Sequence, residues 1–202
     1  MNSKPDIPVC ILAGGAASRF GENKALADLA EKPMVCHVLD RIADQTAGEV
    51  AINANDARPF SDFGLRILPD RKWEKAGPLA GIYAALQWAS QQGFDSVVTV
   101  AVDIPFLPKG FISDIVQTAP PAIAASMGRW HPVNGIWGVR NLPVLDAYLG
   151  SGRRSAHGWA EYCRANVAQF TPLAGQPDPF WNVNTKEDLE QANAMLAQKP
   201  ER

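Results

Sequence analysis

The sequence predicts an α/β fold in which helices cover both faces of a mostly parallel central sheet. Short apolar runs alternate with stretches of helical periodicity along most of the chain, and this is the pattern of strand–helix–strand units with right-handed crossovers. One apolar run, SVVTVAVD at 96–103, has almost no polar side chain on either face. Such a strand belongs in the middle of a parallel sheet that helices cover on both sides.

The first half of the chain shows the more regular pattern. Four strands are expected in it, at 8–12, 49–53, 65–68 and 96–103. Two helices are expected between them, at 32–45 and at about 79–92. Each helix carries an apolar stripe at helical spacing. The first stripe consists of Met34, Val35, Val38, Leu39 and Ile42, and the second of Leu79, Ile82, Leu86 and Ala89.

The second half is less regular but continues the same alternation. Strands are expected at 122–127 and 133–139 on either side of a turn at 128–131, and again at 167–171 and 180–184. Helices are expected at 142–149 and 155–165, and the proline-rich segment 172–179 is expected to be a loop. Thr185 is expected to cap the last helix, because its hydroxyl can accept the amide hydrogen of Asp188 three residues later.

Composition and charge narrow the class of protein. A chain of 202 residues suits one domain over 1–202, with flexible ends at about 1–8 and 199–202. A net charge of -2 gives no basic footprint for nucleic acid, and no apolar run reaches the ~20 residues of a membrane helix. The three cysteines are far apart and form no CxxC pair, which is typical of a reducing cytosol. A cytoplasmic protein without nucleic-acid or membrane partners is expected.

A glycine pair follows the first expected strand, in the string VCILAGGAASRFGENKAL at 9–26. Ligands of open α/β sheets bind beyond the carboxyl ends of the strands, and glycines let an anion approach the backbone amides. Arg19 and Lys24 supply positive charge for phosphate groups. A tight turn with solvated cations is the plain alternative, and the loop matches neither GxxxxGK[ST] nor GxGxxG. The spacing favours a phosphate loop without naming its class.

This loop resembles the signature of nucleotidyltransferases with a Rossmann-like sheet, in which LAGG is followed by small or basic residues, RMG and DK. The resemblance extends in particular to the molybdenum cofactor guanylyltransferase family, the MobA-like enzymes of molybdopterin guanine dinucleotide biosynthesis. Further motifs stand in the order of that family: KP at 32, INAN at 52, LPD at 68, GPLAGI at 77, VDIPFLP at 102, HP at 131, GRR at 152 and NVNT at 182. Asn23 and Phe20 replace the usual Asp and Met of the loop.

The resemblance implies a three-layer α/β/α nucleotidyltransferase fold and the transfer of GMP from GTP to the terminal phosphate of molybdopterin, with release of pyrophosphate. It implies a GTP site in the amino-terminal half, with Mg²⁺ at Asp103 and Mn²⁺ as a substitute. The residues of that half are Leu12, Ala13, Gly14, Gly15, Arg19, Lys24, Asn53, Asp70 and Asp103, and those expected to act in catalysis are Arg19, Lys24 and Asp103. The pterin is expected toward the carboxyl-terminal half, at His131, Arg153, Arg154, Asn182 and Asn184.

Each of these residues also has a plain structural interpretation. Asp103 and Asp70 both follow strands and suit turns or helix caps, and a lone histidine such as His131 is more often a packed residue than a catalyst. Arg153 and Arg154 suit a solvated surface equally well.

The incoming phosphate is already ionised at neutral pH, so the reaction needs no general base.

Rival functions are a cytidylyl- or sugar-nucleotidyltransferase with the same loop, and a non-catalytic protein that delivers cofactor to a molybdoenzyme. A monomer is expected, with transient contacts to molybdoenzymes or their chaperones.

Overall fold

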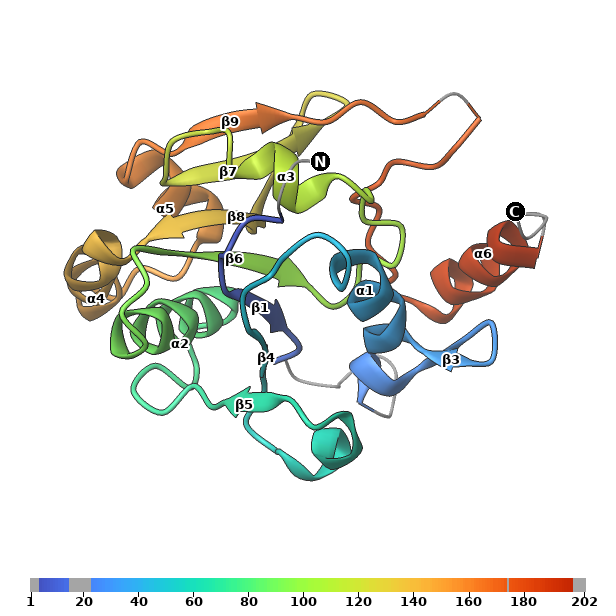
Figure 1. The fold of residues 1–202 in the computed structure, drawn as a ribbon, viewed down its shortest axis with the longest axis horizontal. Coiled ribbons are helices and arrows are strands. Elements are labelled where there is room, and N and C mark those ends of the chain that lie inside the picture. Colours follow the sequence, from blue (N-terminus) through green and yellow to red (C-terminus); the bar gives the residue numbers. More distant parts are fainter. Residues whose placement is uncertain (1–3, 15–22, 174, 198–202) are drawn as a thin grey trace.

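The computed structural model describes residues 4–14, 23–173 and 175–197. A seven-stranded sheet with the order β5-β4-β1-β6-β8-β7-β9 runs through the molecule (Figure 1). Its strands are β1 (Val9–Leu12), β4 (Val50–Asn53), β5 (Arg66–Leu68), β6 (Ser96–Ala101), β7 (Ala122–Ser126), β8 (Arg129–Gly138) and β9 (Asn166–Gln169). Neighbouring strands are parallel except at β8, which is antiparallel to both β6 and β7. The predicted mostly parallel α/β sheet is confirmed.

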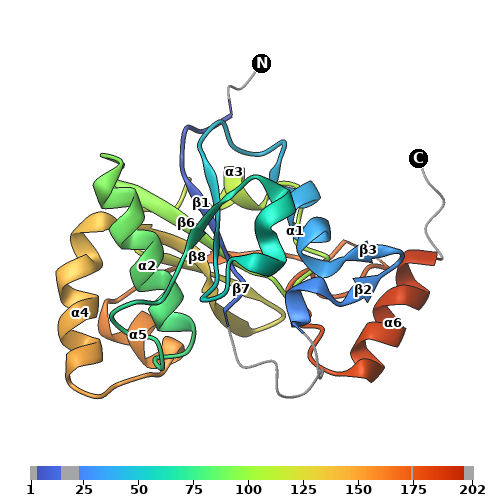
Figure 2. The same cartoon turned by 90° about the horizontal axis from the view of Figure 1, so that it is seen from below.

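Helices cover both faces of the sheet, which gives the expected three layers. Figure 2 shows α2, α4 and α5 on one side and α1 and α3 on the other. The helices are α1 (Met34–Ile42), α2 (Pro78–Gln91), α3 (Phe111–Ile115), α4 (Leu142–Gly150) and α5 (Ala156–Tyr162). The described residues also form three 3₁₀ segments: η1 (Lys24–Leu26) before α1, η2 (Arg58–Phe63) between α1 and α2, and η3 (Val139–Asn141) before α4.

Each face of the sheet has its own apolar core. The first core joins α1 and α3 to one face of β1, β4 and β6, and the second joins α2, α4 and α5 to the opposite face. Helix α2 is largely buried, since ten of its fourteen residues are almost inaccessible to solvent. Because β6 is covered on both sides, Val97, Val98 and Val100 are fully buried, as its apolar sequence predicts.

A smaller layer stands at one side of the sheet. It consists of the hairpin of β2 (Asp28–Leu29) and β3 (Lys32–Pro33), together with α6 (Lys186–Ala197) (Figure 2). Leu29, Met34 and Val183 are fully buried in a third apolar cluster there. The amide of Asp188 donates to the Thr185 hydroxyl at 3.0 Å, so the predicted cap of the last helix is confirmed.

Several sequence predictions were wrong in detail. The helices predicted at 32–45 and 155–165 end at Ile42 and Tyr162. The first helix begins at Met34 rather than 32, because Lys32–Pro33 pairs with β2. The turn predicted at 128–131 is a tighter one: Met127 and Gly128 have φ of 47° and 74°, which suits a two-residue hairpin turn, and Arg129 already pairs in β8. No strand forms at 180–184.

The first described residues belong to the fold rather than to a flexible start. Ile7 is buried, and the Thr46 hydroxyl is within hydrogen-bond distance of the carbonyl oxygens of both Pro5 and Ile7. The rest of the expected flexible ends, residues 1–3 and 199–202, lies outside the described residues. Among the described helices, none combines the length and the apolar character needed to cross a membrane.

Candidate active site

A cleft of about 1360 Å³ opens at one edge of the sheet. The carboxyl ends of β1, β4 and β6 contribute Leu12, Asn53 and Ala101 to its wall, and residues just beyond those ends contribute Gly14 and Asp103. Because β8 runs in the opposite direction, its first residues lie at this same edge and line the cleft as well. The segment between β9 and α6 forms the remaining side. Ligands bind at this place in open α/β sheets.

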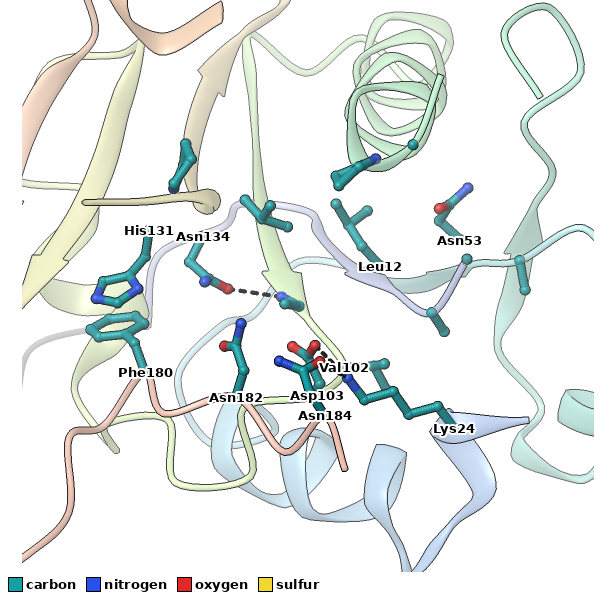
Figure 3. A pocket seen from close by; sticks show the side chains of 18 of the residues that line it. Leu12, Lys24, Asn53, Val102, Asp103, His131, Asn134, Phe180, Asn182 and Asn184 are labelled. Carbon is teal, nitrogen blue, oxygen red and sulfur yellow. Dashed lines mark hydrogen bonds and ion pairs between the residues drawn. The ribbon is translucent and has the colours of Figure 1, made fainter. Parts of the chain in front are cut away.

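Lys24 and Asp103 meet at the centre of the cleft. Lys24 Nζ lies 2.7 Å from Asp103 Oδ2 and 2.5 Å from Asn184 Oδ1, and Figure 3 shows the three side chains converging from three segments of the chain. The two charged side chains are 23% and 19% exposed. Partial burial keeps solvent from screening the pair fully, so an entering phosphate meets a cation that is already held in place.

Asn23 has a structural role that the sequence did not reveal. Its side-chain oxygen accepts the amide hydrogen of Ala25 at 3.1 Å and caps η1, the turn that carries Lys24. Asparagine and aspartate are both good caps of this kind. The replacement of the usual Asp therefore keeps the cap, and the charge that holds Lys24 comes from Asp103 instead.

Asp103 also offers an oxygen to a cation. Its Oδ1 atom is buried and has no hydrogen-bond partner among the described residues, an arrangement that costs free energy unless a ligand satisfies it. A carboxylate oxygen fits Mg²⁺, which takes one or two carboxylates and fills its remaining positions with phosphate oxygens and water. No cluster of three or more His, Cys, Asp or Glu side chains suited to a metal occurs in the described part of the chain. The donor set therefore fits a metal that arrives with a phosphate ligand.

Asn53 and Asp70 form a second polar group at the β4–β5 side of the cleft. Asn53 Nδ2 donates to Asp70 Oδ1 at 2.7 Å and to the carbonyl of Leu68 at 2.8 Å. The amide of Asp70 donates to Asn55 Oδ1 at 2.8 Å. Burial raises the pKa of Asp70, although its hydrogen bonds with Asn53 and Asn55 act in the opposite direction. Asn53 and, at a longer 3.5 Å, Asn55 Nδ2 both donate to the carboxylate of Asp70 and thereby fix its orientation.

The first turn of α2 approaches this group closely. A Cβ atom at Gly81 would lie 2.4 Å from Asn53 Oδ1, a distance that no real side chain tolerates. Glycine at this position lets the helix pack against the end of β4. The string GPLAG therefore shapes the wall beside Asn53.

His131 and Phe180 form the wall at the β7–β8 side. Their rings stack with centroids 4.7 Å apart (Figure 3). His131 Nε2 lies 2.8 Å from Ser126 Oγ, and that hydroxyl lies 2.6 Å from Asp178 Oδ1. Burial lowers the pKa of His131, and nearby Arg129 adds to this effect while Asp178 opposes it.

Most of the predicted site residues line the cleft together: Leu12, Ala13, Gly14, Lys24, Asn53, Asp70, Asp103, His131, Asn182 and Asn184. Gly15 and Arg19 lie outside the described residues. Sequence reasoning missed Asn134, whose side-chain oxygen accepts the amide hydrogen of Ala101 at 2.8 Å. It also missed Asp178, since the loop QPDPF carries no signal that its carboxylate turns back to β7.

Arg153 and Arg154 are not among the residues that line this cleft. Arg153 lies over the rings of Tyr148 and Tyr162, 5.4 and 5.3 Å from their centroids. Arg154 donates to the carbonyl of Leu149 at 2.7 Å and lines a shallow neighbouring pocket of about 330 Å³. The two pockets share Glu74 and Lys75, so Arg154 lies beside the cleft rather than in it.

Comparison with known proteins gives consistent matches over most of the chain. Residues 9–165 match the family described as MobA-like NTP transferase domain. A molybdenum cofactor guanylyltransferase from Rhodobacter capsulatus is 40% identical over 189 residues, which cover 93% of this chain and 95% of the relative. Another, from Rhizobium meliloti (strain 1021), is 37% identical and covers 94% and 91%.

A solved structure agrees in fold. The molybdopterin-guanine dinucleotide biosynthesis protein A from Archaeoglobus fulgidus superimposes with a TM-score of 0.73 over 96% of this chain and 100% of its own. Its sequence is only 20% identical, so the likeness concerns the arrangement of the elements.

Proposed function

The chain belongs to the molybdenum cofactor guanylyltransferases, within the MobA-like NTP transferases, and from that premise we propose how its cleft carries out the reaction. A guanylyltransferase of this family transfers GMP from GTP to molybdopterin. An oxygen of the molybdopterin phosphate attacks the α-phosphorus of GTP, the bond between the α-phosphorus and its bridging oxygen to the β-phosphate breaks, and pyrophosphate leaves. The product is molybdopterin guanine dinucleotide.

The Lys24–Asp103 contact carries this proposal. Phosphoryl transfer needs alignment of two phosphates and neutralisation of charge rather than an acid–base pair. Lys24 brings a cation that is already oriented by Asp103 and Asn184, so little reorganisation is needed when a triphosphate enters. Arg19 is proposed to contribute charge from the same loop, and Gly14 and Gly15 to let the phosphates approach its backbone.

Asp103 would hold Mg²⁺ through its unpartnered Oδ1 oxygen, and Mn²⁺ could replace it. When bound, the metal would supply positive charge to the phosphates of GTP. This assignment is supported by the burial of that oxygen without a hydrogen bond among the described residues.

The two substrates are proposed to occupy opposite halves of the cleft. GTP would lie along the ends of β1, β4 and β6, where the Asn53 side-chain oxygen and the Asp70 carboxylate offer fixed hydrogen-bond acceptors to the base or ribose. Molybdopterin would lie toward His131, Asn182 and Asn184. Arg153 and Arg154 lie beside the cleft rather than in it, and they are proposed to attract the anionic pterin from there. The central position of Lys24 and Asp103 between these halves supports the division (Figure 3).

We further propose that residues 1–202 act as one domain and as a monomer, with transient contacts to molybdoenzymes or their chaperones. A reducing cytoplasm would suit its three free cysteines.

The direct test is incubation of the protein with Mg²⁺, molybdopterin and one nucleoside triphosphate at a time, followed by mass analysis. We expect the guanine dinucleotide and pyrophosphate with GTP. A matched reaction with Asp103→Ala controls for contaminating transferases. A cytidine product instead would favour a cytidylyltransferase, and tight binding of both substrates without product would favour a delivery protein.

A further inference from the structure

Three polar side chains form a hydrogen-bonded row at the β7–β8 side of the cleft. Ser126 Oγ stands between His131 Nε2 at 2.8 Å and Asp178 Oδ1 at 2.6 Å. Ser126 is fully buried, and Asp178 Oδ1 also accepts the amide hydrogen of Phe180 at 3.0 Å. The row therefore runs from the loop before Phe180 to an imidazole on the cleft wall.

Both short contacts of Ser126 are satisfied by one arrangement of hydrogens. A carboxylate only accepts, so the single hydroxyl hydrogen of Ser126 is donated to Asp178. The hydroxyl oxygen then acts as an acceptor toward the ring, and His131 Nε2 must carry the hydrogen that it receives. In a neutral imidazole the other nitrogen, Nδ1, is then a bare acceptor.

The Nδ1 atom of His131 is available to a ligand. It makes no hydrogen bond with any described residue. Unlike Asp103 Oδ1, which is buried without a partner, it is not enclosed by the protein. His131 itself lines the cleft, and Figure 3 shows its ring on the wall near Asn134 and Asn182. The stack on Phe180 fixes the plane of the ring, so the direction of the acceptor is fixed as well.

We propose that Ser126 and Asp178 hold His131 in the Nε2–H tautomer, so that Nδ1 accepts a hydrogen bond from an N–H group of the pterin ring. The identity of this substrate rests on the proposed function, whereas the tautomer does not. A bare nitrogen cannot donate to a phosphate oxygen, but it suits the ring and amino N–H groups of a pterin. The heterocycle therefore lies at His131, and the phosphate end of the same molecule points toward Lys24. Ser126 and Asp178 are positioning residues.

The tautomer is tested by nitrogen-15 NMR of histidine-labelled protein at pH 8. The chain has three histidines, and His37 serves as an internal reference because its Nε2 lies 2.6 Å from the carbonyl oxygen of Leu29, which can only accept. We expect the Nε2–H tautomer at both His37 and His131 in the parent protein. Ser126→Ala should convert His131 to a mixture and leave His37 unchanged. An Nδ1–H tautomer in the parent, or a His131 signal that Ser126→Ala does not alter, would overturn the positioning role.

The ligand is tested by equilibrium binding of molybdopterin, followed through tryptophan fluorescence. His131→Phe keeps an aromatic ring against Phe180 but lacks the acceptor. We expect this variant and Ser126→Ala to raise the molybdopterin Kd by about 2- to 10-fold, the equivalent of one net hydrogen bond, with an unchanged Kd for GTP by calorimetry. Ser113→Ala is the control, since its exposed hydroxyl only donates to the carbonyl of Gly110.

The outcomes separate this inference from the function on which it rests. An unchanged molybdopterin Kd in His131→Phe, or no molybdopterin binding by the parent, would overturn the assignment of the ligand. A parent that binds molybdopterin, responds to both variants and yet transfers no GMP would remove the proposed reaction and leave the acceptor at Nδ1 supported. Thermal melting of each variant shows whether the fold is retained.

Discussion

Lys24 Nζ lies 2.7 Å from Asp103 Oδ2, so the cation of the glycine-rich loop and the carboxylate at the end of β6 neutralise each other at the centre of the cleft. The two residues are 79 positions apart in the chain. Their contact brings together the two groups on which the proposed transfer depends, and each can be removed separately.

Asp103→Ala is expected to reduce GMP transfer by at least about a hundredfold while the fold remains. The variant loses the oxygen proposed to bind the metal and also leaves Lys24 without its partner. Turnover is measured across a Mg²⁺ titration, with circular dichroism to monitor folding. Near-normal turnover with the parent's Mg²⁺ dependence would contradict the role of Asp103.

Lys24→Ala should weaken GTP binding by about 1.5–3 kcal/mol, the usual contribution of a hydrogen bond to a charged group. Calorimetric titration with GTP measures this. Lys109→Ala is the matched control, because Lys109 is exposed and lies away from the cleft lining. Equal GTP affinity in Lys24→Ala and Lys109→Ala would mean that Lys24 only stabilises Asp103.

Asp70→Asn should remove a loss of stability that the parent protein undergoes as pH rises above about 4. Burial raises the pKa of Asp70 in the folded state, so its contribution to stability is fully present below the unfolded pKa of about 3.9 and is lost as pH rises through the folded pKa. The variant lacks this loss. The unfolding free energies of both proteins are measured by urea titration at pH 4 and at pH 7. On going from pH 4 to pH 7, the unfolding free energy of Asp70→Asn should change in a direction more favourable to the folded state than that of the parent.

The same substitution is expected to weaken GTP binding by about 1–3 kcal/mol, since one buried acceptor is replaced. A parallel pH dependence in both proteins would show that burial does not perturb Asp70. Unchanged GTP affinity would remove Asp70 from the nucleotide site.

Replacing both Arg153 and Arg154 with Ala is expected to have two effects. Loss of the contacts with Tyr148, Tyr162 and the carbonyl of Leu149 should lower the unfolding free energy by about 1–2 kcal/mol. Molybdopterin binding should weaken while GTP affinity stays constant. Comparison of the two Kd values below the melting transition separates the effects, and a fall in GTP affinity alone would mean that the halves of the cleft are assigned the wrong way round.

GTP should be used at least about tenfold more efficiently than CTP, which requires only ~1.4 kcal/mol of differential transition-state binding. Guanine and cytosine present different donors and acceptors, so a wall shaped for one leaves polar groups of the other unpaired. The ratio of kcat/KM for the two nucleotides measures this preference. Equal use of both would contradict the guanylyl specificity and leave the family fold untouched.

The spacing of apolar residues predicted most helices and strands because each of these elements packs against one kind of environment. The apolar run of β6 fits a strand covered on both faces, and the apolar stripe of α1 fits a helix that buries one face. The segment 180–184 also looks like a strand, but its apolar residues serve two different cores: Phe180 packs in the first and Val183 in the third. The amide of Val183 donates to the carbonyl of Asp103 at 2.9 Å instead of entering a ladder.

The site was predictable where a motif carried it and not where distant residues meet. The glycine-rich loop, Asp70 and Asp103 stand at strand ends, which topology brings to one edge. The contact of Asp178 with Ser126 joins residues 52 positions apart, and no periodicity or spacing encodes such a meeting. Arg153 and Arg154 were expected at the pterin site, but charge alone does not tell a ligand contact from a structural one. Arg153 stacks on two tyrosines, and Arg154 donates to the carbonyl of Leu149.

The hydrogen bond between Lys24 and Asn184 has a consequence for the order in which the parts of the site can meet while the chain is being synthesised. These partners are 160 residues apart, and at ~5–20 residues per second synthesis of that interval takes roughly 8–32 s. During this time β1, β4 and β6 can already pair and bring Lys24 to Asp103. The side of the cleft that Asn182 and Asn184 form does not yet exist. A chain still on the ribosome can therefore hold Lys24 beside Asp103 before the segment between β9 and α6, which carries Asn182 and Asn184, has been made. The two partners of Lys24 thus become available at different moments of synthesis, Asp103 early and Asn184 late.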